Sequence, residues 1–182
     1  MCGIVGIYLK SKKFEKSLGG MLSKMLVSME SRGPDSAGFA IYNSDKNKTY
    51  KYSICLNEMS FEKFKKEIKK KVKFSSVEKN SDHIILKSIE KPSKILPILE
   101  SYEKISLVGY GKSIEIFKQV GSPSNVVKKF NLANFSGTHA IGHTRMATES
   151  AITTNGSHPY STGEDECLVH NGSLSNHNNL RR

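Results

Sequence analysis

The sequence has few cysteines and no long apolar segment. Cys2, Cys55 and Cys167 are too few and too widely spaced for a disulfide framework, which indicates a reducing compartment. No apolar run approaches the roughly 18 residues of a membrane span, and the first residues lack the basic and apolar segments of a signal peptide. These absences predict a cytoplasmic chain with no membrane partner. Its 182 residues suffice for one domain with its own core.

Acidic residues are scarce relative to basic ones. The chain has 17 Asp and Glu against 28 Lys and Arg, a formal net charge of +11. An excess of this sign can indicate nucleic-acid binding. Much of it, however, is concentrated at 61–73, where the apolar residues recur at helical spacing and lysines occupy the other positions. We therefore predict a solvated helix face and no nucleic-acid partner.

Apolar periodicity predicts a chain of mixed α and β structure. Near the amino terminus it indicates strands at 4–8, 37–42 and 50–56 and a core-facing helix at 18–29. Further along, the predicted helices are 61–72, 93–99 and 124–130, and the predicted strands are 83–86, 105–108 and 113–117. We interpret about 57–120 as an α/β insertion in a single domain, 1–182, with β-rich ends.

Cys2 directly follows Met1 and precedes a short apolar run, Gly3-Ile4-Val5-Gly6. Removal of Met1 would give one residue both a thiol and a free α-amine. The amine has a pKa of roughly 7.7–8.0 and the thiol of roughly 8.5, so the amine can accept the thiol proton. An incidental small residue at a frayed terminus is the alternative. The apolar run argues against it, because a buried strand would anchor this end of the chain.

Three further motifs follow Cys2 in order: Arg32-Gly33-Pro34-Asp35-Ser36-Ala37-Gly38, Gly142-His143-Thr144-Arg145-Met146-Ala147-Thr148 and Val169-His170-Asn171-Gly172. With Cys2, they resemble the glutaminase domain of class II glutamine amidotransferases, which are N-terminal-nucleophile hydrolases. The stretches 32–38, 143–150 and 170–177 are most similar to the separate amidotransferase subunit of N-methylglutamate synthase and related glutamate-synthase-like complexes. Hexosamine-phosphate synthases rank second, because they usually have Trp in place of Met146 and His in place of Glu149.

The resemblance implies an α+β fold, a four-layer α/β/β/α sandwich of two antiparallel sheets covered by helices. It also implies hydrolysis of L-glutamine to glutamate and ammonia, without a cofactor, and transfer of the ammonia to a synthase subunit. Cys2 would be the nucleophile, and Asn171 and Gly172 would stabilise the oxyanions. A different N-terminal-nucleophile amidase and a catalytically idle domain of the same fold are the alternatives.

The same resemblance assigns residues to substrate binding. Arg145 is the expected clamp for the glutamine α-carboxylate, because a guanidinium can form paired hydrogen bonds with a carboxylate. Thr148 is the expected second contact to that group, and His158 falls in the substrate pocket. The alternatives are a surface ion pair for Arg145, a locally bonded hydroxyl for Thr148 and a structural histidine for His158. The residues expected to hold a turn beside the nucleophile are Arg32, Gly33 and Asp35.

Other patterns have simpler interpretations. His139, His143, His170 and Cys167 have offsets that could suit a metal, but they lie on apolar, strand-like segments, and an amide-cleaving thiol needs no metal. We therefore predict no metal there and interpret Cys55 and Cys167 as packing residues. The Asn171-Gly172 pair also fits a type I′ hairpin turn.

The last residues, 175–182, resemble the first turns of a helix. In the family, an Asp that binds the substrate α-amine follows the Asn-Gly pair further along than Arg182. We therefore expect the sandwich to be incomplete at the carboxyl end.

Overall fold

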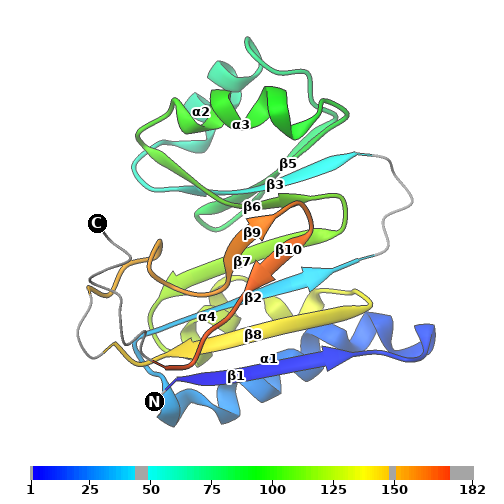
Figure 1. The fold of residues 1–182 in the computed structure, drawn as a ribbon, viewed down its shortest axis with the longest axis vertical. Helices are drawn as coiled ribbons and strands as arrows, with labels where there is room; N and C mark the ends of the chain where they lie inside the picture. The colour runs from blue at the N-terminus through cyan, green and yellow to red at the C-terminus, as the bar shows by residue number, and fades with distance from the viewer. Residues whose placement is uncertain (1, 44–48, 148–150, 173–182) are drawn as a thin grey trace.

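The computed structural model describes residues 2–43, 49–147 and 151–172, and within these ranges two four-stranded antiparallel sheets lie face to face (Figure 1). The first sheet has the order β1-β8-β2-β7, and the second has the order β4-β5-β3-β6. The strands of the first sheet are β1 (Gly3–Tyr8), β8 (His139–Arg145), β2 (Ser36–Tyr42) and β7 (Ile114–Val120). Those of the second are β4 (Ser76–Asn80), β5 (His83–Ser88), β3 (Tyr50–Leu56) and β6 (Ile105–Gly111).

Helices cover the outer face of each sheet (Figure 1). On the first sheet these are α1 (Leu18–Ser28) and α4 (Pro123–Lys129), and on the second α2 (Phe61–Ile68) and α3 (Pro92–Glu100). Short 3₁₀ turns at Lys12–Ser17, Glu30–Arg32 and Leu132–Asn134 complete the helical segments, and a small hairpin joins β9 (Tyr160–Gly163) and β10 (Glu166–Leu168). None of the helices in the described ranges is both long and apolar enough to cross a bilayer.

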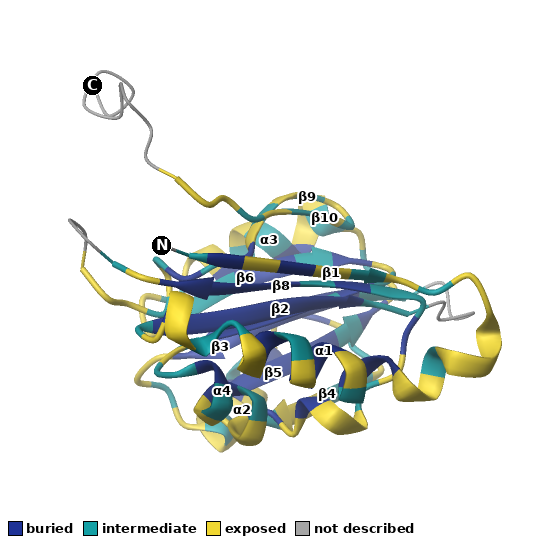
Figure 2. Cartoon of the chain, turned by 90° about the horizontal axis from the view of Figure 1, so that it is seen from below, coloured by how far each residue is buried: buried dark blue, intermediate teal, exposed yellow. Residues whose placement is uncertain are grey.

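Successive side chains of the central strands point to opposite faces of their sheet, and the buried ones form three hydrophobic cores among the described residues. In β2, Phe39 faces α1 and α4, whereas Ala40 faces the second sheet. In β3, Ile54 packs under α2 and α3, whereas Cys55 faces the first sheet. The dark central strands between yellow helix surfaces in Figure 2 show the same layering. This order of helix, sheet, sheet and helix is compatible with the expected α/β/β/α sandwich, and the assignment to N-terminal-nucleophile hydrolases stays a prediction.

The segment 57–120 contributes to both sheets. It supplies β4, β5 and β6 to the second sheet, and β7, which pairs with β2 in the first. Its status as an insertion stays a prediction. The helix predicted at 61–72 ends at Ile68 instead, although Val72 is still buried beyond the following turn.

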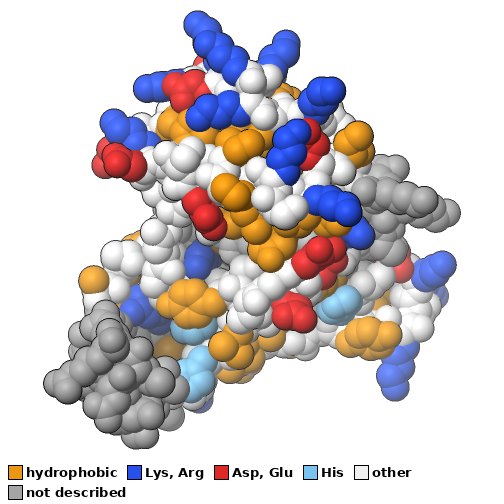
Figure 3. All heavy atoms as spheres, turned by 45° about the horizontal axis from the view of Figure 1, so that its top comes forward, with side chains coloured by type: hydrophobic (Ala, Val, Ile, Leu, Met, Phe, Trp, Pro, Cys, Tyr) orange, Lys and Arg blue, Asp and Glu red, His pale blue; other side chains and the backbone are white. Residues whose placement is uncertain are grey.

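The lysines of α2 lie on its exposed side, as the amphipathic pattern predicts. Phe64 and Ile68 are fully buried, whereas the side chain of Lys63 is 62% exposed. Figure 3 shows basic side chains spread over this helical layer and interspersed with acidic ones. The arrangement fits a solvated face.

Candidate active site

One end of the first sheet brings the separate motifs together. Gly3 of β1 pairs with Thr144 of β8, and Ser36 of β2 pairs with Arg145 of β8. Cys2, immediately before β1, therefore lies at the same sheet end as the turn before β2 and the end of β8. The antiparallel order β1-β8-β2 thus places three of the four motifs side by side.

Cys2 is held by residues from two distant segments. Asn171 Nδ2 donates a hydrogen bond to the Cys2 carbonyl oxygen at 3.0 Å, across 169 residues of sequence. Arg32 Nε donates to the same oxygen at 3.4 Å. The thiol itself contacts the carbonyl oxygen of Met146 at 3.9 Å. Two predicted site residues therefore fix the main chain of the candidate nucleophile.

Two hydrogen bonds join the turn before β2 to the end of β8. Asp35 Oδ2 accepts a hydrogen bond from the Ala147 amide at 2.7 Å, and the Asp35 amide donates to the Arg145 carbonyl at 3.1 Å. A Cβ on Gly33 would lie 2.4 Å from the Thr144 carbonyl carbon, closer than side chains approach backbone. Only glycine permits this approach, which supports the expected structural role of the turn.

Arg145 and His158 lie near each other beside this turn. Arg145 is 8% exposed and donates from Nη1 to the Ala151 carbonyl at 3.2 Å. This burial does not fit the alternative of a surface ion pair. The His158 ring lies 4.2 Å from the His143 ring, measured between centroids, and among the described residues no group hydrogen-bonds its buried Nδ1. Thr148, the other expected substrate contact, lies outside the described residues.

Burial disfavours the charged forms of His158 and His143. Desolvation, followed by the positive charge of neighbouring groups, lowers the pKa of His158 to about 3. Desolvation also lowers the pKa of His143, whose Nε2 lies 2.9 Å from the His170 carbonyl oxygen. That distance is a hydrogen bond in which Nε2 carries the proton. His158 can therefore accept a hydrogen bond near neutral pH without adding positive charge to the site.

The Asn171-Gly172 pair is not a type I′ turn. Such a turn needs positive φ at both central residues. Gly172 has φ +154°, but the described non-glycine residues with positive φ are Ser81, Asn131 and Asp165. The hairpin interpretation is therefore wrong. The two residues are instead exposed, and the Asn171 side chain contacts Cys2.

Comparison with known proteins adds to this geometry. The whole chain aligns with a glutamine amidotransferase-like protein, GlxB, of Rhizobium meliloti, at 46% identity over 186 residues and 62% of the relative's length. It aligns at 31% identity with a putative glutamine amidotransferase of Methanothermobacter thermautotrophicus, again over the whole chain and over 64% of that relative. These similarities support a glutamine amidotransferase domain. The chain spans less than two thirds of either relative.

A third relative shares only part of the chain. The isomerizing glutamine–fructose-6-phosphate aminotransferase of Methanococcus maripaludis is 37% identical over 101 residues, which is 50% of this chain and 16% of that protein. No protein-family model matches the sequence. The similarity to amidotransferases therefore depends on individual relatives.

The chain has a buried lysine beside His158 that sequence reasoning missed. Lys118 of β7 is 5% exposed, and its Nζ donates to the carbonyls of Ser157 at 2.8 Å and Asn155 at 3.2 Å. Desolvation lowers the pKa of Lys118 to about 8. The only sequence signal was a lysine at an inward position of an alternating strand. Lys118 anchors the loop that carries His158.

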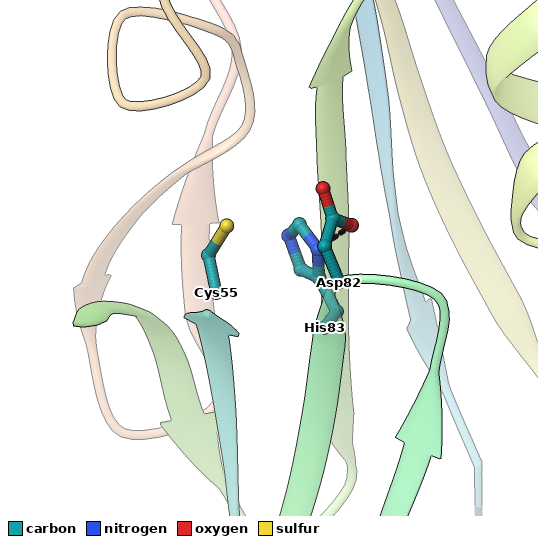
Figure 4. Close-up of side chains that lie close together, drawn as sticks. All are labelled: Cys55, Asp82 and His83. Carbon is teal, nitrogen blue, oxygen red and sulfur yellow. Dashed lines mark hydrogen bonds and ion pairs between the residues drawn. The ribbon is translucent and has the colours of Figure 1, made fainter. Parts of the chain in front are cut away.

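Within the described part of the chain, the cluster that could hold a metal ion is Cys55, Asp82 and His83, with ligand atoms within 4.8 Å of one another (Figure 4). This set differs from the four residues considered from the sequence. Cys167 instead lies 3.4 Å from the Tyr42 hydroxyl and packs between the sheets. Its contacts fit the packing role expected of it.

Proposed function

We propose that this domain is the glutaminase half of a glutamine amidotransferase, which hydrolyses L-glutamine and passes ammonia to a synthase subunit. The observation that carries the proposal is the contact between Asn171 Nδ2 and the Cys2 carbonyl, 3.0 Å long. It joins the proposed nucleophile to a proposed oxyanion donor from the other end of the sequence. Amidotransferase relatives that align over the whole chain support the same activity.

The proposed chemistry uses Cys2 as both nucleophile and base. Once Met1 is removed, the α-amine takes the thiol proton and the sulfur attacks the side-chain amide carbon of glutamine. The tetrahedral oxyanion collapses, the carbon–nitrogen bond breaks, and the amine returns the proton to the leaving ammonia. Water then attacks the thioester, which releases glutamate and restores the thiol. The amide groups of Asn171 and Gly172 would stabilise the oxyanion in both halves of the reaction.

Substrate recognition is proposed for the neighbouring cationic and polar groups. Arg145 would bind the glutamine α-carboxylate, with Thr148 as a second contact, and neutral His158 would line the pocket. The turn containing Gly33 and Asp35 would keep the Arg145 segment in register with Cys2 through the hydrogen bonds of Asp35.

Within the amidotransferases, we propose a separate subunit of the N-methylglutamate synthase or glutamate-synthase-like type. Over the whole chain, identity to the two amidotransferase-like relatives is 46% and 31%, whereas identity to the glutamine–fructose-6-phosphate aminotransferase of Idiomarina loihiensis, which also aligns over the whole chain, is 24%. That difference in identity favours the separate subunit over the hexosamine-phosphate-synthase type. The ammonia acceptor would be bound by another subunit.

Labelling with 6-diazo-5-oxo-norleucine, a glutamine-shaped alkylating agent, tests the proposal. We expect intact mass and peptide mapping to show loss of Met1 and modification of Cys2 alone, with protection by L-glutamine. Cys167→Ala is the matched control and should label normally. Retention of Met1, or an unlabelled Cys2 after Met1 is lost, would contradict the proposed nucleophile.

A further inference from the structure

The segment 169–172 contains the proposed oxyanion donors, and few contacts attach it to the sheets. It follows β10, and three of its four residues are exposed. Within the described ranges, two hydrogen bonds join it to other parts of the chain. Asn171 Nδ2 donates to the Cys2 carbonyl at 3.0 Å, and the ring of His143 donates to the His170 carbonyl at 2.9 Å. An exposed segment with so few contacts opens at little cost if one of them is lost.

The imidazole of His143 is the rigid one of these two anchors. His143 is fully buried in β8, where it is opposite Ile4 of β1 on one side and Gly38 of β2 on the other. Its ring lies 4.2 Å from the ring of His158, measured between centroids. A side chain enclosed in this way has little freedom to turn, so it can hold the His170 carbonyl in one place.

The hydrogen bond fixes which nitrogen of the ring carries the proton. A carbonyl oxygen only accepts, so Nε2 of His143 is protonated. Burial, aided by the charge of Arg145 and opposed by the bond to His170, lowers the pKa of His143 and disfavours the charged ring. In the neutral ring Nδ1 is the bare nitrogen, and no described residue hydrogen-bonds it. Within the described chain, the ring therefore makes its hydrogen bond to His170 alone.

We propose that His143 is a positioning residue of the candidate active site, a role that rests on the proposed function. Its Nε2–H holds the His170 carbonyl, and this keeps the next two amide groups, those of Asn171 and Gly172, beside the nucleophile. The Asn171 side chain alone would have to hold the segment and serve the oxyanion at once. The same strand pairing fixes the nucleophile, because Cys2 lies two residues before the partner of His143 in β1.

Glutaminase kinetics of His143→Phe test this role. Phenylalanine fills the space of the ring but has no N–H for the His170 carbonyl. We expect kcat to fall about 10²-fold, a typical effect of misplacing a group in an active site, with a smaller change in KM. His143→Gln, whose Nε2 can donate to the same carbonyl, should have a kcat about tenfold higher than that of His143→Phe. The matched control His139→Phe, at the other end of β8, should keep the original kcat.

A double-mutant cycle separates positioning from a general loss of structure. In the Asn171→Ala background, His143→Phe should lower kcat by about tenfold or less, because only the Gly172 amide remains to be positioned. Alkylation of Cys2 by iodoacetamide passes through no oxyanion, so its rate, followed by peptide mapping, should be the same in His143→Phe as in the original chain. An undiminished loss of kcat in the Asn171→Ala background, or slower alkylation of Cys2, would overturn the proposal.

¹⁵N NMR of the His143 ring gives a readout that does not depend on activity. Near neutral pH we expect the proton on Nε2 and a bare Nδ1, with the signals assigned by their loss in His143→Gln. A proton on Nδ1 instead would overturn the proposal even in an inactive chain. Lack of glutaminase activity in the original chain would contradict the proposed function, and the tautomer would still decide whether His143 holds the His170 carbonyl.

Discussion

The side chain of Asn171 has two amide hydrogens, and the contact with Cys2 uses one of them. The other can serve a developing oxyanion. Asn171→Ala should therefore lower the kcat for glutamine hydrolysis about 10²–10³-fold, the usual loss for one oxyanion donor. Because Asn171 is exposed, stability should hardly change. Asn125→Ala, at an exposed position on α4, is the matched control, and equal kcat values for the two variants would exclude the proposed role.

The single side chain of Lys118 holds the loop that contains Asn155 and Ser157. Lys118→Met leaves the carbonyls of Ser157 and Asn155 without their donor, so we expect a loss of about 1–3 kcal/mol in the free energy of unfolding. The KM for glutamine should rise more than kcat falls, because the loop carries His158 and not the nucleophile. Urea denaturation and steady-state kinetics measure the two effects. Lys112→Met, whose side chain is 51% exposed, should change stability by less than about 0.5 kcal/mol.

At the scale of elements, the contact between the turn at Gly33 and the end of β8 allows no extra atoms. Gly33→Ala should cost about 1–3 kcal/mol, because the new methyl group meets backbone atoms of Thr144 and Arg145 that cannot rotate away. Gly20 provides a matched control in α1. A Cβ there meets nothing within 4 Å, and Gly20→Ala should stabilise the helix by about 0.5–1 kcal/mol. Urea denaturation of both variants should give changes of opposite sign, and the same sign would contradict this account.

Which elements could be predicted depended on how strongly their apolar residues alternate. The strand at Ser36–Tyr42 and the helix at Leu18–Ser28 match the predicted ranges within a residue or so because each has a buried stripe. The strand at Ser76–Asn80 was missed because it is a polar edge strand with no fully buried residue. Helix α2 was predicted too long because lysines, good helix formers, continue past Ile68.

The candidate site, like the fold, could be predicted only in part. The order of the motifs predicted which segments belong to it, and the β1-β8-β2 pairing brings three of them to one sheet end. The cross-strand pair of Cys55 and His83 could not be predicted, because its register depends on which strands pair and on where the β4–β5 turn begins. Lys118 was missed for a similar reason, since its partners are backbone carbonyls of a distant loop.

At the scale of the whole molecule, wholly or partly buried histidines make stability depend on pH. Desolvation lowers the pKa of His158 to about 3, and it lowers the pKa values of His139 and His143 as well. Below a pH of about 6.5, the unfolded chain binds protons that the folded chain does not. Stability should therefore fall as the pH is lowered from about 6.5 towards 4. Urea midpoints at several pH values measure the slope, and a flat profile over this range would contradict the buried neutral histidines.

His158→Gln should flatten that slope, because one of the groups that takes up a proton only on unfolding is gone. The matched control for loss of one imidazole is the exposed His170→Gln, which should keep the slope of the original chain.

Asp82 affects stability in a different pH range. Burial opposes its ionisation, but hydrogen bonds from His83 and Lys129 prevail and lower the pKa of Asp82 to about 2. The stability from ionised Asp82 is complete above about pH 4 and is lost as the pH falls towards 2. Asp82→Asn should therefore remove the pH dependence of stability only below about pH 4. If this variant instead removed the dependence between about pH 6.5 and 4, the histidines would not be the cause of that dependence.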